Sequence, residues 1–572
     1  MTSTYDTLNQ RLQVGYDALE AGADPVLRGS DHSDYQSNGV MGLAKRLGRP
    51  PRDVAADVVA ACDLTGVAVA DIAGPGFINL TLETSFLAGQ LLGTLDDDRL
   101  GIAAASAPLT VVIDYSAPNV AKEMHVGHLR STVIGDSLRR HYEFAGHRVI
   151  ARNHVGDWGT PFGMLIEHLV DLGEQEAMSS LSIGDLDSFY RDARTKFDSD
   201  ASFAERSRQR VVALQSGDET TVRLWRLLVD ESVRYFDEVY RKLDVELEPG
   251  DVVGESYYND QLADVVRELD ELGLLVEDNG ASCVFPPGFT NRDGEPLPLI
   301  VKKSDEGFGY AATDLAALRD RVSDLRADEM LYVVGAPQSQ HFAMVFATAR
   351  LAGWLPDSVR CEHVPFGNVL GTDRKMFKSR SGETVKLVGL LDEAVDSAES
   401  ELANRDAGLD ADERRRLAYV IARAAIKYAD LCTERTRDYV FDLDRMIAFE
   451  GDTGPYLAYA HARIRSIFRR LDGDWEPGEI AFSLSHRAER DLALGILSFP
   501  EAFEASLSAL LPHKLCAYLF DLAQRFTTFY ESCPVLNAPG DLRDERLALC
   551  DLTARTLAIG LSLLGIEAPE RM

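Results

Sequence analysis

Buried-strand patterns that alternate with helical patterns constrain the middle of the chain most strongly. The runs are Thr110–Tyr115, Arg148–Arg152, Leu299–Val301, Leu331–Val334 and His363–Phe366. Strands separated by helices are typical of an α/β fold built on a parallel sheet. The sequence therefore predicts one such domain over residues 106–395.

A helical insertion is expected within this domain, at about residues 170–250. An apolar stripe follows one face of the pattern there, formed by Trp225, Leu228, Val229, Val233, Phe236 and Tyr240. Only Ser232 interrupts the stripe. A stripe at this spacing indicates an amphipathic helix that packs against a core.

Two further regions flank the predicted sheet domain. Residues 1–105 have the pattern of a small α+β unit, with Val54, Val58 and Val59 on one helical face and short strands at Val67–Ala70 and Phe77–Leu82; the stretch near 95–108 resembles a linker. Residues 396–572 are predicted to be helical, and their clearest helices are Arg415–Leu431, Tyr456–Leu471 and Ala502–Tyr530. We therefore expect a multidomain α/β protein with an all-α C-terminal region.

The charge balance is strongly acidic. The 572 residues include 92 Asp and Glu against 59 Lys and Arg, a net charge of −33. An acidic surface repels nucleic-acid phosphates at ordinary ionic strength. Only 11 of the basic residues are lysines, and the acids are spread along the whole chain. This favours a halophilic protein, because the Debye length falls to about 3 Å in molar salt; an ordinary acidic cytosolic protein is the alternative.

Cysteine spacing and hydropathy point to a cytoplasmic protein. The seven cysteines form no CxxC pair, so we expect neither a disulfide framework nor a structural zinc site. The N-terminal residues carry no signal-peptide pattern. No apolar run approaches the ~18 residues that a membrane span needs.

Two histidines follow the first strand, in the segment His125-Val126-Gly127-His128, with a helix expected from Thr132. Three residues apart at a helix start, they share one face. Free backbone N–H groups and the helix dipole favour phosphate there. Gly127 leaves room for a nucleotide against the backbone. The pattern is short, and its position after a strand is what makes it a candidate phosphate site.

Two lysines lie far downstream in a polar loop, Lys375-Met376-Phe377-Lys378-Ser379. Ammonium groups three residues apart can clamp a polyphosphate as charge develops in a transition state. Lys122, Lys375 and Lys378 place three of the 11 lysines in or beside these two segments. A solvated surface loop is the alternative for the segment taken alone.

Together the two segments resemble the HIGH and KMSKS signatures of class I aminoacyl-tRNA synthetases, with Val126 and Phe377 as the departures. Further motifs resemble the arginyl-tRNA synthetase family along nearly the whole chain. These motifs are Tyr115–Lys122, Asn153–Thr160, Gly254–Ser256, Tyr310–Asp314, Gln338–His341, Gly454–Arg463, Leu564–Met572 and Ala73–Leu80.

This resemblance implies a two-step reaction, in which arginine attacks the α-phosphate of Mg·ATP and the adenylate is then transferred to the 3′-terminal adenosine of tRNA(Arg). In this family the first step usually needs bound tRNA. The catalytic residues it implies are Lys122, His125, His128, Lys375 and Lys378, and ATP contacts add Gly127, Met376 and Ser379. Zinc is not expected.

For arginine, the resemblance implies a pocket formed by Asn119, Glu255, Tyr310, Asp314 and Gln338. Carboxylates and amide oxygens suit a five-donor guanidinium. Asp314 and Tyr310 are expected at the guanidinium, and Asn119 and Glu255 at the α-amino end. Gln340 is an alternative to Gln338.

For tRNA, the family resemblance implies that Phe77 and Asn79 in the N-terminal domain contact the D-loop. A ring can stack on an unpaired base while an amide bonds its edge; a core Phe and a turn Asn are the alternative. It also implies that an anticodon-binding domain at about 455–572 uses Tyr456, Tyr459, His461 and Arg463. We expect a monomer that binds neither membrane nor DNA.

Three alternatives stay open at this stage. A synthetase for cysteine or methionine would be expected to bring zinc ligands, and one for glutamate would need basic residues in place of Glu255 and Asp314. A simpler nucleotidyltransferase would not need the flanking domains. A non-catalytic tRNA-binding paralogue would be expected to lose the histidines or the lysines.

Overall fold

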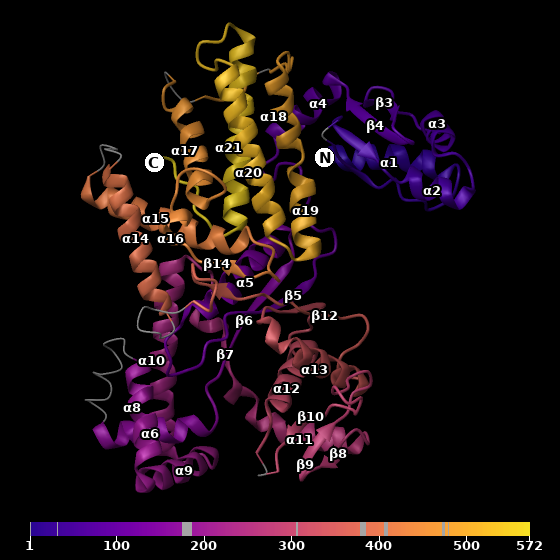
Figure 1. Cartoon of the computed structure of the whole chain (residues 1–572). Coiled ribbons are helices and arrows are strands. Elements are labelled where there is room, and N and C mark those ends of the chain that lie inside the picture. Colours follow the sequence, from indigo (N-terminus) through magenta and orange to yellow (C-terminus); the bar gives the residue numbers. More distant parts are fainter. Residues whose placement is uncertain are drawn as a thin grey trace.

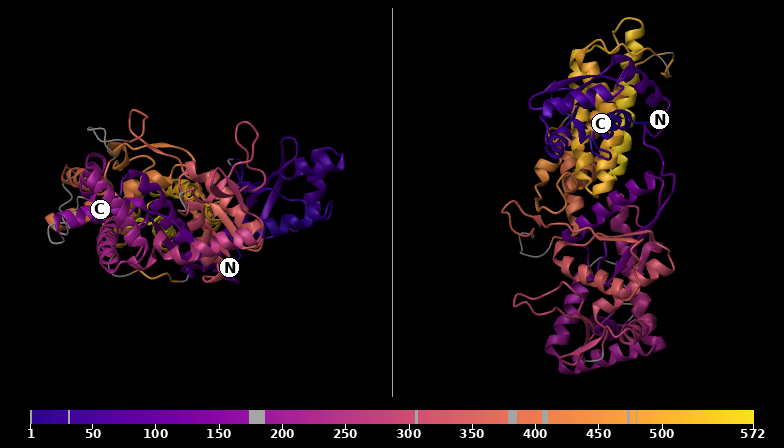
Figure 2. Two further views of the ribbon diagram at one scale, coloured as in Figure 1. Left: turned by 90° about the horizontal axis from the view of Figure 1, so that it is seen from below. Right: turned by 90° about the vertical axis from the view of Figure 1, so that its right-hand side faces the viewer.

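The computed structural model describes residues 2–30, 32–173, 186–304, 307–377, 385–404, 410–471, 475–478 and 480–572. Its central parallel sheet lies between a bundle of C-terminal helices and a lower part that contains the insertion (Figure 1). The two further views show an elongated molecule, with the N-terminal domain beside the C-terminal helices (Figure 2). The predicted multidomain α/β organisation is confirmed.

The N-terminal domain is the α+β unit that the sequence predicts. Its elements are α1 (Thr4–Asp17), β1 (Leu27–Gly29), β2 (Tyr35–Ser37), α2 (Val40–Leu47), α3 (Pro51–Ala61), β3 (Ala68–Ala73), β4 (Phe77–Leu82) and α4 (Thr84–Leu95). The strands pair antiparallel in the order β1-β2-β4-β3. Val54 and Val58 are fully buried on α3, as the predicted helix face requires.

The central sheet has five parallel strands in the order β12-β11-β5-β6-β7. They are β5 (Thr110–Asp114), β6 (Arg148–Val155), β7 (Val252–Gly254), β11 (Glu329–Tyr332) and β12 (Arg360–His363). The connecting helices include α5 (Val126–Phe144), α12 (Tyr310–Ser323) and α13 (Ser339–Leu351). Because the strands are parallel, the segments after β5, β6, β7 and β11 all leave one edge of the sheet, where open α/β sheets bind ligands.

One predicted strand of this sheet lies elsewhere. Leu299–Val301 forms β10 (Leu299–Lys302), which pairs antiparallel with β9 (Ala281–Val284) in a separate sheet with β8 (Val276–Asp278). Leu299 and Val301 are buried while Ile300 is 46% exposed. This alternation is typical of a one-faced antiparallel sheet and not of a strand covered on both sides. The sequence predicts a strand at His363–Phe366. The observed strand, β12, lies three residues earlier, because Arg360–His363 is the stretch that pairs with β11.

The insertion is helical, as predicted. It contains α6 (Thr160–Leu172), α8 (Leu186–Ser199), α9 (Ala201–Gln215) and the 25-residue α10 (Glu219–Leu243). Leu228, Phe236 and Tyr240 of the predicted stripe are buried. The chain returns to the sheet through the short 3-10 helix η1 (Pro249–Asp251), and η2 (Glu255–Tyr258) and α11 (Asn259–Glu271) follow β7.

The C-terminal region is mainly helical. Its helices are α14 (Leu387–Asn404), α15 (Ala411–Leu431), α16 (Leu443–Met446), α17 (Gly454–Phe468), α18 (Arg487–Leu497), α19 (Phe499–Ala509), α20 (His513–Ser532) and α21 (Asp541–Leu563). The predicted helix Ala502–Tyr530 is two helices, because Leu510 has a φ of +55° and Pro512 follows. β14 (Tyr439–Val440) pairs with β13 (Val369–Leu370) and ties this region to the sheet domain. Among the described residues, no helix combines the length and apolar character needed to cross a membrane.

Candidate active site

The turn between β5 and α5 has an unusual backbone. Ser116, Ala117 and Ala121 have positive φ values of 73°, 46° and 59°. Non-glycine residues in this region each cost about 1 kcal/mol. Three of them within six positions require strong local support, and such strain is typical of functional turns.

Buried polar groups supply that support. The Asn153 side chain, on β6, accepts a hydrogen bond from the Ala117 N–H at 3.0 Å and donates to the Tyr240 hydroxyl at 2.9 Å. The Tyr240 hydroxyl lies 2.8 Å from the Ser116 hydroxyl. The Ser116 N–H donates in turn to Ser131 Oγ on α5.

Ser232, which interrupts the apolar stripe of α10, has a similar function. Its hydroxyl accepts a hydrogen bond from the Ala121 N–H at 2.9 Å. Ser232 and Tyr240 therefore make the insertion a support for the turn that leads to the histidines.

The two histidines begin α5 and cap it. The Gly127 N–H donates to His125 Nδ1 at 3.0 Å, and the His125 N–H donates to His128 Nδ1 at 3.1 Å. Helix α5 thus starts at Val126, six residues before the predicted start. The expectation of free N–H groups for phosphate is wrong at Gly127 and Val126, because the Val126 N–H donates to the carbonyl of Val385. A Cβ at Gly127 would lie 2.7 Å from the His125 ring, so this close packing requires glycine.

Both rings are neutral and keep one N–H donor. Burial lowers the pKa of His125, and burial together with the neighbouring His125 lowers the pKa of His128 to about 3. The rings are therefore neutral near pH 7. Since each Nδ1 accepts a backbone hydrogen bond, each proton lies on Nε2. The ring centroids are 4.0 Å apart, so the two imidazoles form one compact pair.

Residues 385–387, which follow the lysine segment in sequence, contact this helix start. The Leu387 N–H donates to the Met124 carbonyl at 2.9 Å, and His125 forms a β-bridge with Lys386. Lys378 and Ser379 lie outside the described residues. Lys375 is exposed, and Met376, 57% exposed, forms a β-bridge with Leu370 of β13.

Two other residues near the lysines have clear positions. Phe377, the departure from the family signature, is half-buried and stacks on Phe441 with a centroid distance of 5.0 Å. Lys122 is half-buried, with Nζ 4.5 Å from the centre of the Tyr190 ring on α8.

Three carboxylates gather where β6, β7 and α12 meet. Burial, followed by the negative charges of Asp157 and Asp314, raises the pKa of Glu255 to about 7. Asp157 is buried and accepts hydrogen bonds from the Ser256 N–H at 2.8 Å and the Ser256 hydroxyl at 2.6 Å. Asp314 Oδ2 lies 2.6 Å from His341 Nε2. Acceptors of this kind suit a cationic ligand such as a guanidinium or an ammonium group.

The remaining predicted arginine contacts are exposed around these acids. Asn119 follows the strained turn and forms a β-bridge with Gly156. Tyr310 is 74% exposed and lies one helical turn before Asp314, on the same side of α12. Gln338, at the end of the 3-10 helix η3 (Ala336–Gln338), and Gln340 are both exposed. The structure does not distinguish between the two glutamines.

Sequence reasoning missed Asp157 and His341 as site residues. Both lie inside motifs that the sequence offered, Asn153–Thr160 and Gln338–His341. Membership of these two motifs was the only signal in the sequence. Neither motif indicates that Asp157 lies close to Glu255 or that His341 lies close to Asp314.

The predicted RNA contacts lie far from one another. Phe77 and Asn79 are half-buried on β4, and Gln36 donates a hydrogen bond to the Asn79 side chain at 2.7 Å. On α17, Tyr459 is 38% exposed, whereas Tyr456 is half-buried against Phe520.

The other two α17 residues have structural neighbours. His461 is buried and lies 3.0 Å from the carbonyl of Pro569, and this burial argues against direct contact with RNA. The Arg463 guanidinium lies 4.8 Å from the centre of the Tyr530 ring.

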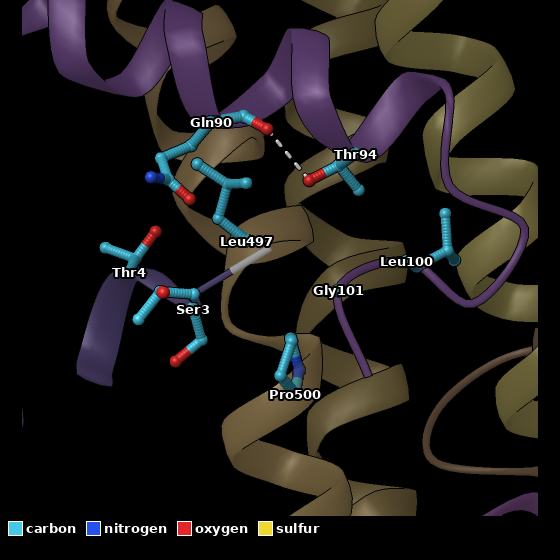
Figure 3. Close-up of a pocket in the computed structure, with 9 residues that line it drawn as sticks. Ser3, Thr4, Gln90, Thr94, Leu100, Gly101, Leu497 and Pro500 are labelled. Atoms are coloured by element: carbon cyan, nitrogen blue, oxygen red, sulfur yellow. Dashed lines mark hydrogen bonds between the residues drawn. The ribbon is translucent and has the colours of Figure 1, made fainter. Parts of the chain in front are cut away.

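A small pocket at the junction of the N-terminal domain and α19 is separate from these groups (Figure 3). It includes Thr94, whose hydroxyl donates to the Gln90 carbonyl at 2.9 Å, but none of the predicted site residues. Within the described parts of the chain, no group of three His, Cys, Asp or Glu side chains is arranged to hold a metal ion.

Three family models match the chain. Residues 8–82 match the arginyl tRNA synthetase N terminal domain, residues 90–443 match the tRNA synthetases class I (R), catalytic domain, and residues 457–572 match the DALR anticodon binding domain.

Full-length relatives agree with these matches. The chain is 53% identical to the arginine–tRNA ligase of Thermobifida fusca, with 96% of this chain and 95% of the relative covered. It is 49% identical to that of Synechococcus elongatus over 99% and 98% of the two chains. The solved arginyl-tRNA synthetase of Plasmodium falciparum is 30% identical, covers 100% of both chains and superposes with a TM-score of 0.87. The chain therefore belongs to the arginyl-tRNA synthetase family of class I aminoacyl-tRNA synthetases.

Proposed function

We propose that the protein ligates L-arginine to the 3′-terminal adenosine of tRNA(Arg), through an arginyl-adenylate formed from ATP with release of pyrophosphate. One observation supports this most directly. The segments 124–126 and 385–387 pair through their backbones, so the chain just after the lysine segment lies at the start of the histidine helix.

The first step needs position and electrostatics more than acid–base chemistry. A carboxylate is already a nucleophile, so no general base is required. His125 and His128 offer neutral Nε2–H donors to the phosphates, which stabilise developing negative charge. Lys122, Lys375 and Lys378 supply positive charge, with Gly127, Met376 and Ser379 as further ATP contacts. Mg²⁺ enters with ATP and neutralises phosphate charge.

Arginine is held at the opposite end of the site. Asp314 and Tyr310 face the guanidinium, Glu255 and Asn119 face the α-amino group, and Gln338 or Gln340 completes the pocket. The carboxylates support this proposal, because a buried acid group without a cationic partner is costly and arginine supplies two positive charges.

Partners and organisation follow the same proposal. The tRNA contacts Phe77 and Asn79 at one end, and Tyr456, Tyr459 and Arg463 at the other. Adenylate formation depends on bound tRNA. The domain bounds are 1–105, 106–395 and 396–572, and the protein works as a cytoplasmic monomer.

The test is ATP–pyrophosphate exchange with each amino acid, with and without tRNA(Arg). Exchange with arginine alone among the amino acids, and only in the presence of tRNA, is the expected result. Exchange with another amino acid would favour a different synthetase, and its absence under all conditions would favour a non-catalytic tRNA-binding paralogue. Lys378→Ala should depress exchange far more than it weakens arginine binding.

A further inference from the structure

Arg130 lies on α5, five residues after His125, and its side chain is almost completely buried, at 1% exposure. Its Nε lies 3.3 Å from Oδ1 of Asp430, a fully buried residue of α15. Its Nη1 donates to the carbonyl of Arg437 at 2.8 Å. The guanidinium also lies 5.2 Å from the centre of the Tyr439 ring. One side chain of the histidine helix thus contacts both α15 and the segment around β14.

The segment around β14 leads directly to the lysines. Tyr439 pairs with Val369 in the parallel β13–β14 ladder. On its other side, β13 accepts the Phe377 N–H at the Val369 carbonyl, at 3.2 Å, and Leu370 bridges to Met376. Lys375 is the next residue along the chain. Two short backbone pairings, β14 with β13 and β13 with residues 376–377, therefore connect the segment that Arg130 contacts to Lys375.

Stability does not explain this buried ion pair. Replacing buried pairs by apolar groups is often neutral or stabilising, because both ions lose hydration. Here burial raises the pKa of Asp430, while Arg130 acts in the opposite direction. The Tyr439 hydroxyl hydrogen-bonds to the Asp430 carboxyl group, whereas Arg130 Nη2 is buried with no hydrogen-bond partner among the described residues. The planar guanidinium instead fixes the direction of each hydrogen bond that Arg130 makes, and so the relative position of its partners.

We propose that Arg130 is a positioning residue of the adenylation step. Through Asp430 and the Arg437 carbonyl it fixes the β13–β14 pair, and with it Lys375, relative to His125 and His128. This inference rests on the proposed function, because it assigns Arg130 to the ATP end of that reaction. It also predicts that the arginine end is unaffected, because Glu255 and Asp314 lie on other elements.

The chain offers a matched control in the C-terminal helices. Arg546 also makes one bond to a buried carboxylate, from Nε to Glu489 at 2.7 Å, and one to a backbone carbonyl, from Nη1 to Pro534 at 2.7 Å. It lies on α21, away from β13 and β14. Arg130→Lys and Arg546→Lys therefore each remove a guanidinium that bonds one carboxylate and one backbone carbonyl. Only Arg130 lies between the histidine segment and the lysine segment.

The experiment measures tRNA-dependent exchange, arginine affinity, tRNA affinity and thermal unfolding for both variants. Arg130→Lys should raise the KM for ATP and lower kcat of exchange, with a combined loss on the order of 10²-fold. Its affinities for arginine and tRNA should stay within about twofold of wild type, since none of the proposed contacts of either ligand lies at this joint. Arg546→Lys should lower Tm and leave all kinetic constants near wild type.

Asp430→Asn is the second variant, because it keeps the shape of the side chain and removes its charge. It should shift the KM for ATP in the same direction as Arg130→Lys. Wild-type ATP kinetics in both variants, or a loss equal to that of Arg546→Lys, would overturn the inference while leaving the proposed function intact. Absence of arginine-dependent exchange in the wild-type enzyme would instead overturn the proposed function.

Discussion

The two ends of the candidate site are built in different ways. At the proposed ATP end, the histidine pair comes from one continuous segment, in which the rings of His125 and His128 are fixed by bonds to the backbone of their own helix start. The arginine end is assembled from three distant segments that carry Asp157, Glu255 and Asp314. Burial moves both ends towards neutrality, lowering the pKa of the imidazoles and raising that of Glu255 to about 7.

The pKa shifts towards the neutral form have opposite consequences for ligand binding at the two ends. A neutral imidazole is the form that donates from Nε2 while accepting at Nδ1, so the proposed role of the histidines uses the state that burial favours. A carboxyl group binds a cation best when ionised, so in the proposed pocket a protonated Glu255 must lose its proton when the α-amino group of arginine binds. Under the proposed assignment, the ATP end is thus ready before its ligand binds, and the arginine end is completed by its ligand.

The largest expected effect separates the two functions of His125, cap and donor. His125→Asn keeps a good N-cap but removes the Nε2 donor, and His125→Ala removes both. Both should lower kcat of exchange about 10²–10³-fold, as the loss of a transition-state donor does. Only the alanine variant should also lose about 1 kcal/mol of stability, measured by thermal or denaturant unfolding. Wild-type exchange in the asparagine variant would show that the ring acts only as a cap.

Asp314→Asn tests the other end. Loss of the charge should raise the KM for arginine on the order of 10–100-fold, the cost of about 1.5–3 kcal/mol for a hydrogen bond to a charged group. The KM for ATP should change less than about threefold if the two ends bind independently. Steady-state exchange with each substrate varied in turn measures both constants. Equal changes in the two would contradict the division of the site.

The acidity of Glu255 predicts a pH dependence confined to arginine binding. Below pH 7 the carboxyl group of the free protein is increasingly protonated, so binding must expel a proton and affinity falls by up to about tenfold per pH unit. Above pH 7 the affinity should level off. Calorimetric titration with arginine at pH 6, 7 and 8 measures this. Glu255→Gln should bind more weakly and lose the slope; a slope that survives in this variant would assign the proton to another group.

The smallest effect concerns the support that the insertion gives to the ATP end. Tyr240→Phe removes the hydroxyl that contacts Ser116 and Asn153. The expected loss is about 1 kcal/mol of unfolding free energy, with a change of only a few fold in the KM for ATP. Tyr332→Phe, on β11, is the control, because the Tyr332 hydroxyl is buried with no hydrogen-bond partner among the described residues. Equal losses in both variants would contradict a specific role for Tyr240.

Much of the fold followed from local patterns. Short apolar runs predicted β5 and β6, and β5 is buried almost throughout, as expected of a parallel strand covered on both faces. The Leu299–Val301 run was placed in the wrong sheet because three residues are too few to show alternation. The split at Leu510 was missed because its left-handed conformation depends on packing between α19 and α20.

The site was predictable where it is continuous in sequence and unpredictable where it depends on pairing. His125, His128 and Lys375 stand out in short segments. The partnership of Asp314 with His341, and that of Arg130 with Asp430, joins elements remote in sequence and depends on the tertiary fold. His461 shows the converse limit of a motif. Its position in the motif suggested a contact with RNA, but its side chain is buried next to the Pro569 carbonyl.

Adaptation to salt stays a prediction. A surface with net charge −33 should bind tRNA through stacking and base edges, because counterion release contributes little at molar salt. We expect tRNA binding and aminoacylation to persist or rise towards molar KCl. Loss of activity over that range, with the fold intact by circular dichroism, would contradict halophily.

The middle of the histidine helix is completed by residues synthesised very late. The Ser137 hydroxyl of α5 donates to the carbonyl of Leu563 at 3.0 Å, across 426 residues of sequence, and the buried Lys427 ammonium donates to the carbonyl of Gly565 at 2.7 Å. A nascent chain on the ribosome therefore holds this helix with its polar surroundings unfinished until position 565 has emerged. Premature termination before that point would damage the ATP end as directly as it damages the anticodon end, so incomplete translation products are not expected to charge tRNA.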